Sequence, residues 1–279
     1  MKFTKMHGTG NDYIYINCFE EKIDDGTDLA IKLSNRNYGI GSDGLILIKP
    51  SKVADFYMDM YNSDGSKGKM CGNGIRCVGK FVYDKGLTKK EDLKIETGSG
   101  VKDLKLHIED DQVKSVTVDM GMPITNPKDI PVISKNPIVG APIEIGGLNF
   151  NMTCLSFGNP HAVVFVDNTK DIDIKRIGPL FEHHQMFPDR VNTEFVQVID
   201  KDTIKMRVWE RGSGETLACG TGACASAYAC IKNGLTNNRL TVKLLGGDLV
   251  IQYLERKNKI LMTGPAKTVY EGIINIKGL

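Results

Sequence analysis

Two stretches of this chain share a glycine-rich pattern that begins with cysteine. MCGNGIRC starts at residue 70 and ACGTGACA at residue 218, so Cys71 aligns with Cys219 at an offset of 148 residues (219 minus 71). Without a gap, the alignment runs on to the GLT tripeptides at 86–88 and 234–236. Self-similarity at a fixed offset indicates a structural unit that occurs twice. The chain is therefore expected to fold as two halves of one topology.

The same offset relates further residues in the two halves. In each half, short strand-like runs surround one helix that follows the cysteine, at 75–86 and 223–234, and both helices end in glycine. Because these helices carry few charges on any face, we expect them to be buried. This pattern predicts the α+β class, with a strand-rich layer around a buried helix in each half. The further matched residues are Asn11 with Asn159, Gly44 with Asn192, and Asn62 with Glu210.

Proline content places the boundary between the halves. The segment 123–142 holds half of the ten prolines, which predicts irregular or edge-strand structure there. We expect an N-terminal half at 1–119 and a C-terminal half at 120–264.

The bulk composition indicates the class of protein. The chain has 279 residues, of which 41% are hydrophobic and 25% charged, as in ordinary globular proteins. A formal net charge of +2 argues against a nucleic-acid partner. The first residues lack the apolar run of a signal peptide, and the longest apolar runs are strand-sized. We therefore expect a cytoplasmic protein that does not bind or cross a membrane.

The seven cysteines do not predict a disulfide framework, because their number is odd and the chain is long. Cysteine and histidine spacings match no zinc site, so no metal is expected. A single cysteine at a helix start is most often a small buried hydrophobe. Five cysteines without a matched partner and a glycine cradle are interpreted in that way: Cys18, Cys77, Cys154, Cys224 and Cys230.

Cys71 and Cys219 favour a chemical role because each begins a glycine-rich helix start. The first turn of a helix has free N–H groups and a partial positive charge, which bind carboxylate or phosphate. A thiol there is expected to have a lowered pKa of about 7–8. Because the two thiols influence each other, we expect one thiolate and one thiol in the pair. Such a pair suits removal of a proton from one face of a Cα and delivery of another to the opposite face.

The same residues carry a resemblance to a known family. The motifs HGTGND (7–12), YNSDGS (61–66), MCGNGIRC (70–77), GNPH (158–161), RVN (190–192) and ERGSGETLACGTGAC (210–224) resemble those of diaminopimelate epimerases over essentially the whole chain. The resemblance implies two pseudo-symmetric domains, each a barrel-like, mostly antiparallel sheet around a central helix, with 265–279 returning to the first domain. It also implies a cofactor-independent interconversion of LL- and meso-diaminopimelate in lysine and peptidoglycan precursor biosynthesis, by a homodimer.

The resemblance assigns roles to individual residues. Cys71 and Cys219 match the two acid/base thiols, and His161 and Glu210 match groups that tune them. Arg211 suits a carboxylate because its planar fork binds two oxygens, and Glu210 suits an ammonium group. The substrate-binding positions that the resemblance implies are Asn11, Asn62, Gly72, Asn73, Asn159, Asn192, Glu210, Arg211, Gly220 and Thr221.

One position departs from the family pattern, and three alternative functions remain open. Some members carry a substrate-contacting glutamine where this chain has Gly44. A proline- or hydroxyproline-type racemase would share the cysteine-glycine cradle but needs no second amino-acid grip. GTGACA at 220–225 fits a dinucleotide-binding pattern, although no acidic strand end follows about 20 residues later. A non-catalytic amino-acid-binding protein is the third alternative.

Overall fold

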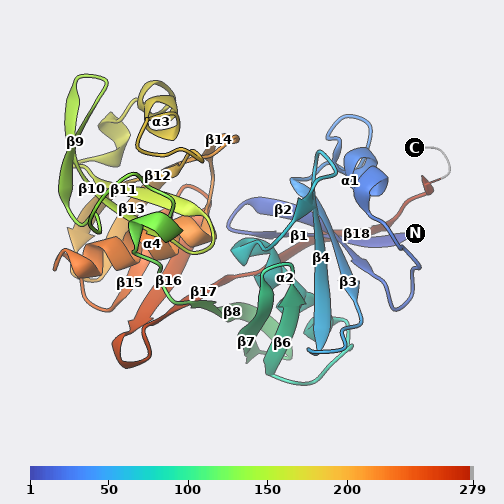
Figure 1. The fold of residues 1–279 in the computed structure, drawn as a ribbon. Coiled ribbons are helices and arrows are strands. Elements are labelled where there is room, and N and C mark those ends of the chain that lie inside the picture. The colour runs from blue at the N-terminus through green and yellow to red at the C-terminus, as the bar shows by residue number, and fades with distance from the viewer. Residues whose placement is uncertain (277–279) are drawn as a thin grey trace. The chain divides into compact units, whose positions relative to one another are not determined.

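The computed structural model describes residues 1–276 and divides the chain into two compact units (Figure 1). Unit 1 is Met1–Asp119 together with the chain from Thr263 onward, and unit 2 is Met120–Met262. The two boundaries fall inside strands β8 (Gln112–Gly121) and β17 (Lys259–Pro265).

Unit 1 consists of strands around one central helix, α2 (Gly72–Asp84), with a shorter helix α1 (Thr27–Ser34) near β3 and β4. The last strand of the unit, β18 (Lys267–Ile273), pairs antiparallel with the first, β1 (Lys2–Gly8). Of the predicted return of 265–279 to this half, residues 277–279 lie outside the described residues. The remaining strands are β2 (Asn11–Asn17), β3 (Gly44–Lys49), β4 (Phe56–Asn62), β5 (Lys67–Gly68), β6 (Asp92–Thr97), β7 (Gly100–Glu109) and most of β8.

Unit 2 repeats this plan around helix α4 (Gly220–Lys232), with α3 (Ile174–Glu182) outside it. The proline-rich segment holds only a short 3₁₀ helix, η1 (Pro127–Asp129), and an isolated bridge from Ile124 to Ser156 before β9 begins. The other elements are β9 (Ala141–Ile145), β10 (Leu148–Ser156), β11 (Pro160–Phe165), η2 (Thr169–Asp171), β12 (Asn192–Asp200), β13 (Thr203–Glu210), β14 (Gly214–Thr216), β15 (Arg239–Leu244), β16 (Gly247–Leu254), η3 (Glu255–Lys257) and most of β17.

Strand pairing shows that the two units share one topology. β2 pairs parallel with β3, and β11 pairs parallel with β12. β4 pairs parallel with β6, and β13 pairs parallel with β15. Most other pairings are antiparallel, including β3 with β4 and β12 with β13. The predicted α+β class, with a mostly antiparallel sheet around a helix in each half, is confirmed.

The central helices are buried, as their composition predicts. Every residue of α2 from Gly72 to Val82 is buried, and α4 is buried at Gly220 and from Gly222 to Cys230. Strands surround each helix within its own unit (Figure 1). α2 nevertheless contains the buried cations Arg76 and Lys80, whose charges are met by hydrogen bonds to backbone carbonyls and, for Lys80, by Asp84.

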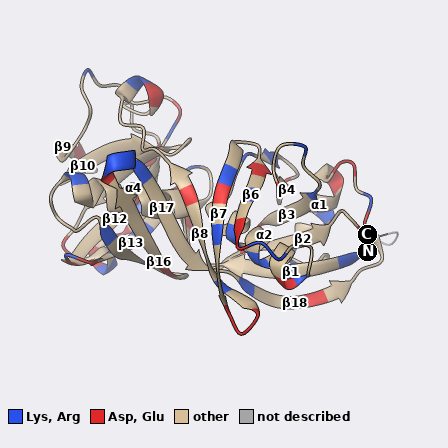
Figure 2. Ribbon diagram, turned by 90° about the horizontal axis from the view of Figure 1, so that it is seen from below, with Lys and Arg blue, Asp and Glu red and all other residues tan. Residues whose placement is uncertain are grey.

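Charged residues of both signs are interspersed within each unit (Figure 2). On β7, for example, Lys102, Asp103, Lys105 and Glu109 lie within a single strand. Within residues 1–276, no helix combines the length and apolar character needed to span a bilayer.

Candidate active site

Cys71 and Cys219 are the N-cap residues of α2 and α4. Each has an extended backbone, with φ/ψ of −133°/118° at Cys71 and −119°/114° at Cys219. Each Sγ accepts a hydrogen bond from the backbone N–H three residues later, at 3.3 Å from Gly74 N and at 3.3 Å from Gly222 N. The sulfur thus takes the place that a serine or aspartate oxygen has in an ordinary helix cap. This geometry explains why a cysteine stands directly before each glycine-rich helix start.

Gly74 and Gly222 are required by close packing of each helix start on a neighbouring strand. A Cβ added at Gly74 would lie 2.8 Å from Ile46 Cδ1, on β3. A Cβ added at Gly222 would lie 2.6 Å from Glu194 Oε1, on β12. The glycines therefore let each helix start pack closely on its sheet, in addition to the predicted close approach of a ligand to the amides.

In unit 1, Asn11 connects the Cys71 thiol to a set of ion pairs. The thiol donates to Asn11 Oδ1 at 3.2 Å, and Asn11 Nδ2 donates to Asp43 Oδ2 at 2.7 Å. Arg36 pairs with Asp43 at 2.9 Å and with Asp12 at 2.8 Å. Because Asp43 accepts from the amide nitrogen, the Asn11 oxygen is held toward the thiol. Asp43 thus positions Asn11.

Asn73 and Arg76 complete the first helix start. Arg76 is fully buried, and its guanidinium donates to Asn73 Oδ1 at 3.0 Å and to the Gly72 carbonyl at 3.1 Å. Thr9 donates to the same Asn73 oxygen at 3.3 Å. The permanently charged guanidinium of Arg76 therefore reaches back to the first turn of α2, near the cap cysteine.

In unit 2, a line of polar side chains leads from Cys219 to a buried His–Glu pair. Cys219 Sγ lies 3.5 Å from Thr221 Oγ1, which accepts from Asn159 Nδ2 at 3.2 Å. Asn159 Oδ1 is 3.1 Å from His161 Nε2. On the other side of the ring, His161 Nδ1 is 2.7 Å from Glu194 Oε1, and both side chains are fully buried.

Glu210 is the second carboxylate near Cys219. Thr216 donates a hydrogen bond to it, and Glu210 also accepts a hydrogen bond from the Cys219 thiol. Burial raises the pKa of Glu210 above its usual range, while these two hydrogen bonds act in the opposite direction. The residue that matches it in unit 1, Asn62, donates to Ser66 Oγ at 2.9 Å in the turn after β4 and carries no charge.

Arg211 and Asn192 lie next to each other in unit 2. The backbone N–H of Arg211 donates to Asn192 Oδ1 at 2.8 Å, and its guanidinium donates to the Asp189 carbonyl at 2.8 Å. The Arg211 side chain is exposed, whereas Asn192 is buried. One end of the planar fork is therefore held by backbone while the side chain reaches solvent.

The predicted lowering of the thiol pKa is wrong. Burial raises the pKa of Cys71, and the Gly74 N–H, the Tyr13 hydroxyl and Arg76 only partly offset it. Burial also raises the pKa of Cys219 well above its usual range, and the negative charges of Glu210 and Glu194 add to the effect. The helix start favours the thiolate as expected, but loss of hydration at a buried site is the larger effect. Both thiols are therefore harder to ionise than a free cysteine in the protein without substrate.

The other cysteines lie in packed positions. Cys77, Cys154, Cys224 and Cys230 are buried, and Cys18 is half-buried. Burial raises the pKa of Cys18 and of Cys77 to about 11 and that of Cys230 to about 12. These thiols are poorly suited to acid–base chemistry near neutral pH.

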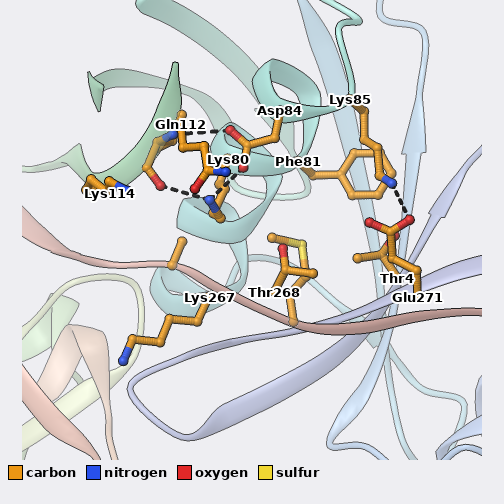
Figure 3. Close-up of a pocket in the computed structure, with 13 residues that line it drawn as sticks. Thr4, Lys80, Phe81, Asp84, Lys85, Gln112, Lys114, Lys267, Thr268 and Glu271 are labelled. Atoms are coloured by element: carbon orange, nitrogen blue, oxygen red, sulfur yellow. Dashed lines mark hydrogen bonds and ion pairs between the residues drawn. The ribbon is translucent and has the colours of Figure 1, made fainter. Parts of the chain in front are cut away.

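A separate hollow of unit 1, drawn in Figure 3, lies at the opposite end of α2 from Cys71. Four of its charged side chains form two ion pairs, since Lys80 binds Asp84 at 2.6 Å and Lys85 binds Glu271 at 2.5 Å. Lys80 and Asp84 are 9 and 13 residues along the chain from the cap cysteine, or about 13–20 Å along a helix. The hollow contains none of the predicted site residues.

The predicted residues thus form two groups that contact one another within their own units. In unit 1, Cys71, Asn11 and Asn73 lie together, and Asn62 pairs with Gly44 across β3 and β4. In unit 2, the polar line joins Cys219, Thr221, Asn159 and His161. Glu210 hydrogen-bonds to Cys219.

Four residues near the thiols are missing from the predicted set: Tyr13, Asp43, Arg76 and Glu194. The repeat itself offered a signal for one of them. At the offset of 148 residues, Tyr13 falls on the predicted residue His161, whereas Glu194 falls on Ile46, which is apolar.

The helix start of unit 2 does not have the setting of a dinucleotide site. The strand before α4, β14, has three residues and pairs antiparallel with β13. A dinucleotide site is built on a parallel βαβ unit in which the strand directly before the helix is part of the parallel sheet. GTGACA therefore matches that sequence pattern without its structural context.

Solved structures of related fold come from several enzyme groups. A PhzF-family phenazine biosynthesis protein from Bacillus anthracis superposes with a TM-score of 0.71 at 17% identity, covering 99% of both chains. A hydroxyproline epimerase from Agrobacterium vitis superposes with a TM-score of 0.69 at 16% identity, covering 98% of this chain and 90% of that one. At this level of identity the similarity shows the fold alone.

Sequence comparison is more specific. The profile of the family described as diaminopimelate epimerase matches residues 3–125 and 153–269. A diaminopimelate epimerase from Acetivibrio thermocellus is 56% identical over the whole of both chains. One from Agathobacter rectalis is 54% identical over 99% of this chain and 100% of its own. This chain belongs to the diaminopimelate epimerase family.

Proposed function

We propose that this protein interconverts LL- and meso-diaminopimelate without a cofactor, using Cys71 and Cys219 as a two-base pair. The observation that carries the proposal is the duplicated helix cap: each thiol accepts from the N–H of the third residue of its own buried helix. The chain that holds these caps is similar over its full length to proteins named diaminopimelate epimerase.

The two helix starts supply the binding groups for the reacting carboxylate. The first N–H groups of each helix, at Gly72 and Asn73 in unit 1 and at Gly220 and Thr221 in unit 2, have no acceptor within the helix itself, and that of Asn73 hydrogen-bonds to the Cys71 sulfur. Neither first turn contains an acidic side chain that would compete for them. When a proton leaves Cα, negative charge spreads onto the carboxylate, and fixed N–H dipoles stabilise it without reorganising. We propose that both helix starts bind one carboxylate in the working enzyme.

The two thiols then act from opposite faces of the adjacent carbon. One sulfur, as thiolate, removes the Cα proton, while the other, as thiol, delivers its own proton to the opposite face. Each turnover leaves the two sulfurs with exchanged protonation states, so either one serves as base in one of the two directions. One thiolate and one thiol are needed, because two neighbouring thiolates would repel each other.

Substrate binding supplies the charge that forms the thiolate. Both thiols have raised pKa values in the free protein, and the carboxylate of Glu210 is one cause at Cys219. The α-ammonium group of the substrate carries the charge that pairs with Glu210. Such an ion pair reduces the repulsion between Glu210 and a Cys219 thiolate, so the pKa of Cys219 falls when substrate binds.

The polar residues beyond the thiols bind the second amino-acid end of the substrate. Arg211 has the planar fork that binds a carboxylate through two hydrogen bonds. Asn11, Asn62, Asn159 and Asn192 provide donors and acceptors for a zwitterion. A proline-type substrate has no second end, so it would leave Arg211 without a ligand.

The setting of this activity follows from the family and the charge distribution. We propose a cytoplasmic homodimer that works in lysine and peptidoglycan precursor biosynthesis and has no nucleic-acid partner. Positive and negative side chains alternate along single strands (Figure 2). This supports the absence of a nucleic-acid partner, because nucleic-acid-binding surfaces gather Lys and Arg on one face.

The direct test incubates the purified protein with LL-diaminopimelate and no added cofactor, and follows the stereoisomers by chiral chromatography. We expect a mixture of LL and meso forms, with L-proline unchanged in a parallel incubation. Racemised proline with unchanged diaminopimelate would assign the protein to the racemase alternative. Tight binding of diaminopimelate without any isomerisation would indicate a binding protein instead.

A further inference from the structure

Tyr13 occupies in unit 1 the position that His161 occupies in unit 2. In the parallel pair β2–β3, Tyr13 is the partner of Gly44, and in the parallel pair β11–β12, His161 is the partner of Asn192. The repeat offset of 148 residues relates Tyr13 to His161 and Gly44 to Asn192. The repeat thus gives Tyr13 and His161 equivalent places on equivalent strands.

The Tyr13 ring is buried and its hydroxyl reaches the cap cysteine. The residue is 5% exposed, and its hydroxyl hydrogen-bonds with the Cys71 sulfur and the Asn11 side chain. Cys71 Sγ therefore has three donors, the Tyr13 hydroxyl and the backbone N–H groups of Gly74 and Asn73, and one acceptor, Asn11 Oδ1. When the thiol ionises, the three donors remain favourable, whereas the Asn11 oxygen no longer receives a proton.

Gly44 leaves the space that the Tyr13 ring needs. A Cβ added at Gly44 would lie 2.8 Å from Tyr13 Cε1 and 2.2 Å from the Tyr61 carbonyl oxygen. A longer side chain at this position is incompatible with the ring where it stands. Gly44 therefore leaves room for the Tyr13 ring and for the close approach of the Tyr61 carbonyl.

We propose that Tyr13 is a positioning residue for Cys71, and that its hydroxyl donates a hydrogen bond which stabilises the thiolate. The inference deepens the proposed function, because it names the group that prepares the thiol of unit 1. A phenol is neutral when it donates, so Tyr13 supports the thiolate without adding a charge. Unit 2 has instead a histidine paired with the buried carboxylate of Glu194.

Other groups around Cys71 act in known directions. Arg76, on α2, lowers the pKa of the thiol through its positive charge. Asp43, in the loop before β3, raises the pKa of Tyr13, as does the neighbouring Cys71. Burial is the largest cause and keeps the pKa of Tyr13 well above 10, so the hydroxyl stays protonated throughout the range in which a thiol titrates.

The test measures ionisation of Cys71 directly in the intact protein. Iodoacetamide reacts with thiolates, so the rate of alkylation at Cys71, followed by peptide mass spectrometry between pH 6 and 11, gives its apparent pKa. In Tyr13→Phe, loss of the donor should raise the pKa of Cys71 and slow its alkylation at a fixed pH about three- to tenfold. The effect is limited to this size because sulfur is a weak hydrogen-bond acceptor, although hydrogen bonds to charged groups are strong. Alkylation of Cys219 in the same sample should be unchanged.

Tyr15→Phe is the matched control. Tyr15 lies two residues along β2, is fully buried, and donates from its hydroxyl to the Gly74 carbonyl at 3.2 Å. Its loss should lower the melting temperature as Tyr13→Phe does, without the same shift at Cys71. If Tyr13 has a purely structural role, Tyr13→Phe and Tyr15→Phe should show the same ionisation curve for Cys71, whether or not that curve differs from the curve of the unaltered protein. Such a result would overturn the proposal.

A second variant, Tyr13→His, copies unit 2 and restores a donor. We expect it to alkylate faster at Cys71 than Tyr13→Phe does at the same pH, whereas identical rates would contradict a donor role for this position. These measurements need no turnover, so their outcome is independent of whether the protein acts on diaminopimelate. An inactive protein with the predicted thiol shifts would contradict the proposed function alone.

Discussion

The two cysteine-capped helix starts have the same backbone but different surroundings. Cys71 lies among neutral and cationic partners, including Asn11, Tyr13 and the buried Arg76. Cys219 lies beside two carboxylates, Glu194 and Glu210. Burial raises the pKa of both thiols. The increase is larger at Cys219, because the two carboxylates add to the effect of burial. Duplication thus preserved the cap, while side chains from the neighbouring strands made the two thiols chemically different.

The largest expected effect comes from removing either sulfur. Cys71→Ala and Cys219→Ala should each lower turnover of LL-diaminopimelate by at least about 10²–10⁴-fold, the usual contribution of a positioned acid or base. Steady-state rates for the two variants, with circular dichroism to verify folding, provide the measurement. Retention of near-normal turnover in one variant would remove that thiol from the mechanism and leave the other as a single base.

A second prediction compares the glycines that pack each helix start on its strand. Gly222→Ala should cost about 1–3 kcal/mol of unfolding free energy, because the new methyl group meets the buried Glu194 carboxylate. Gly74→Ala should cost less, since it meets the end of the Ile46 side chain and alanine favours helix by about 1 kcal/mol. Urea unfolding of the two variants measures the difference, and a larger loss at Gly74 would contradict this account of the packing.

A third prediction concerns the carboxylates of unit 2. Glu210→Gln removes a negative charge that raises the pKa of Cys219, so that pKa should fall and alkylation at a fixed pH should accelerate about three- to tenfold. Asn62→Asp, which places a carboxylate at the matched position of unit 1, should slow alkylation of Cys71. If Cys219 reacts no faster in Glu210→Gln, Glu210 does not act on the thiol by its charge.

The smallest effect on stability is expected from the ion pairs that Asp12, the residue after Asn11, forms with Arg36 and Lys5. Arg36 and Lys5 hold the pKa of Asp12 below its usual range, against the opposing effect of burial. A lowered folded-state pKa contributes stability above the unfolded pKa, and this stability disappears as pH falls through the folded value. Asp12→Asn should therefore cost about 1 kcal/mol at pH 7 and progressively less below about pH 4. Unit 2 has Pro160 at this position and no such dependence there. A cost in Asp12→Asn that stays constant with pH would contradict the ion-pair explanation.

The sequence predicted the elements that depend on local pattern. The offset that aligns Cys71 with Cys219 also relates the bounds of α2 and α4, because glycine and cysteine patterns fix where a helix begins. The alignment of Asn62 with Glu210 matches the ends of β4 and β13. Such features are encoded within a few residues, so they can be read before the fold is known.

The thiol environment could not be read in the same way. The pKa prediction was wrong because a helix start is visible in sequence, whereas the burial of its cap depends on distant strands. Arg76 has a buried charge in a helix that composition marks as apolar, and its partners include the Pro265 carbonyl, 189 residues away. Tyr13 and Glu194 become meaningful only when the strand registers place them beside the caps.

The central claim is that two thiols act from opposite faces of one carbon, and solvent isotope labelling tests it most directly. LL-diaminopimelate is incubated with the protein in D₂O, and deuterium in recovered substrate and in product is measured by mass spectrometry at early conversion. Two bases predict one deuterium at the inverted carbon of the product and almost none in recovered substrate. Deuterium that accumulates in recovered substrate as fast as in product would show that one base serves both faces, and would contradict the account.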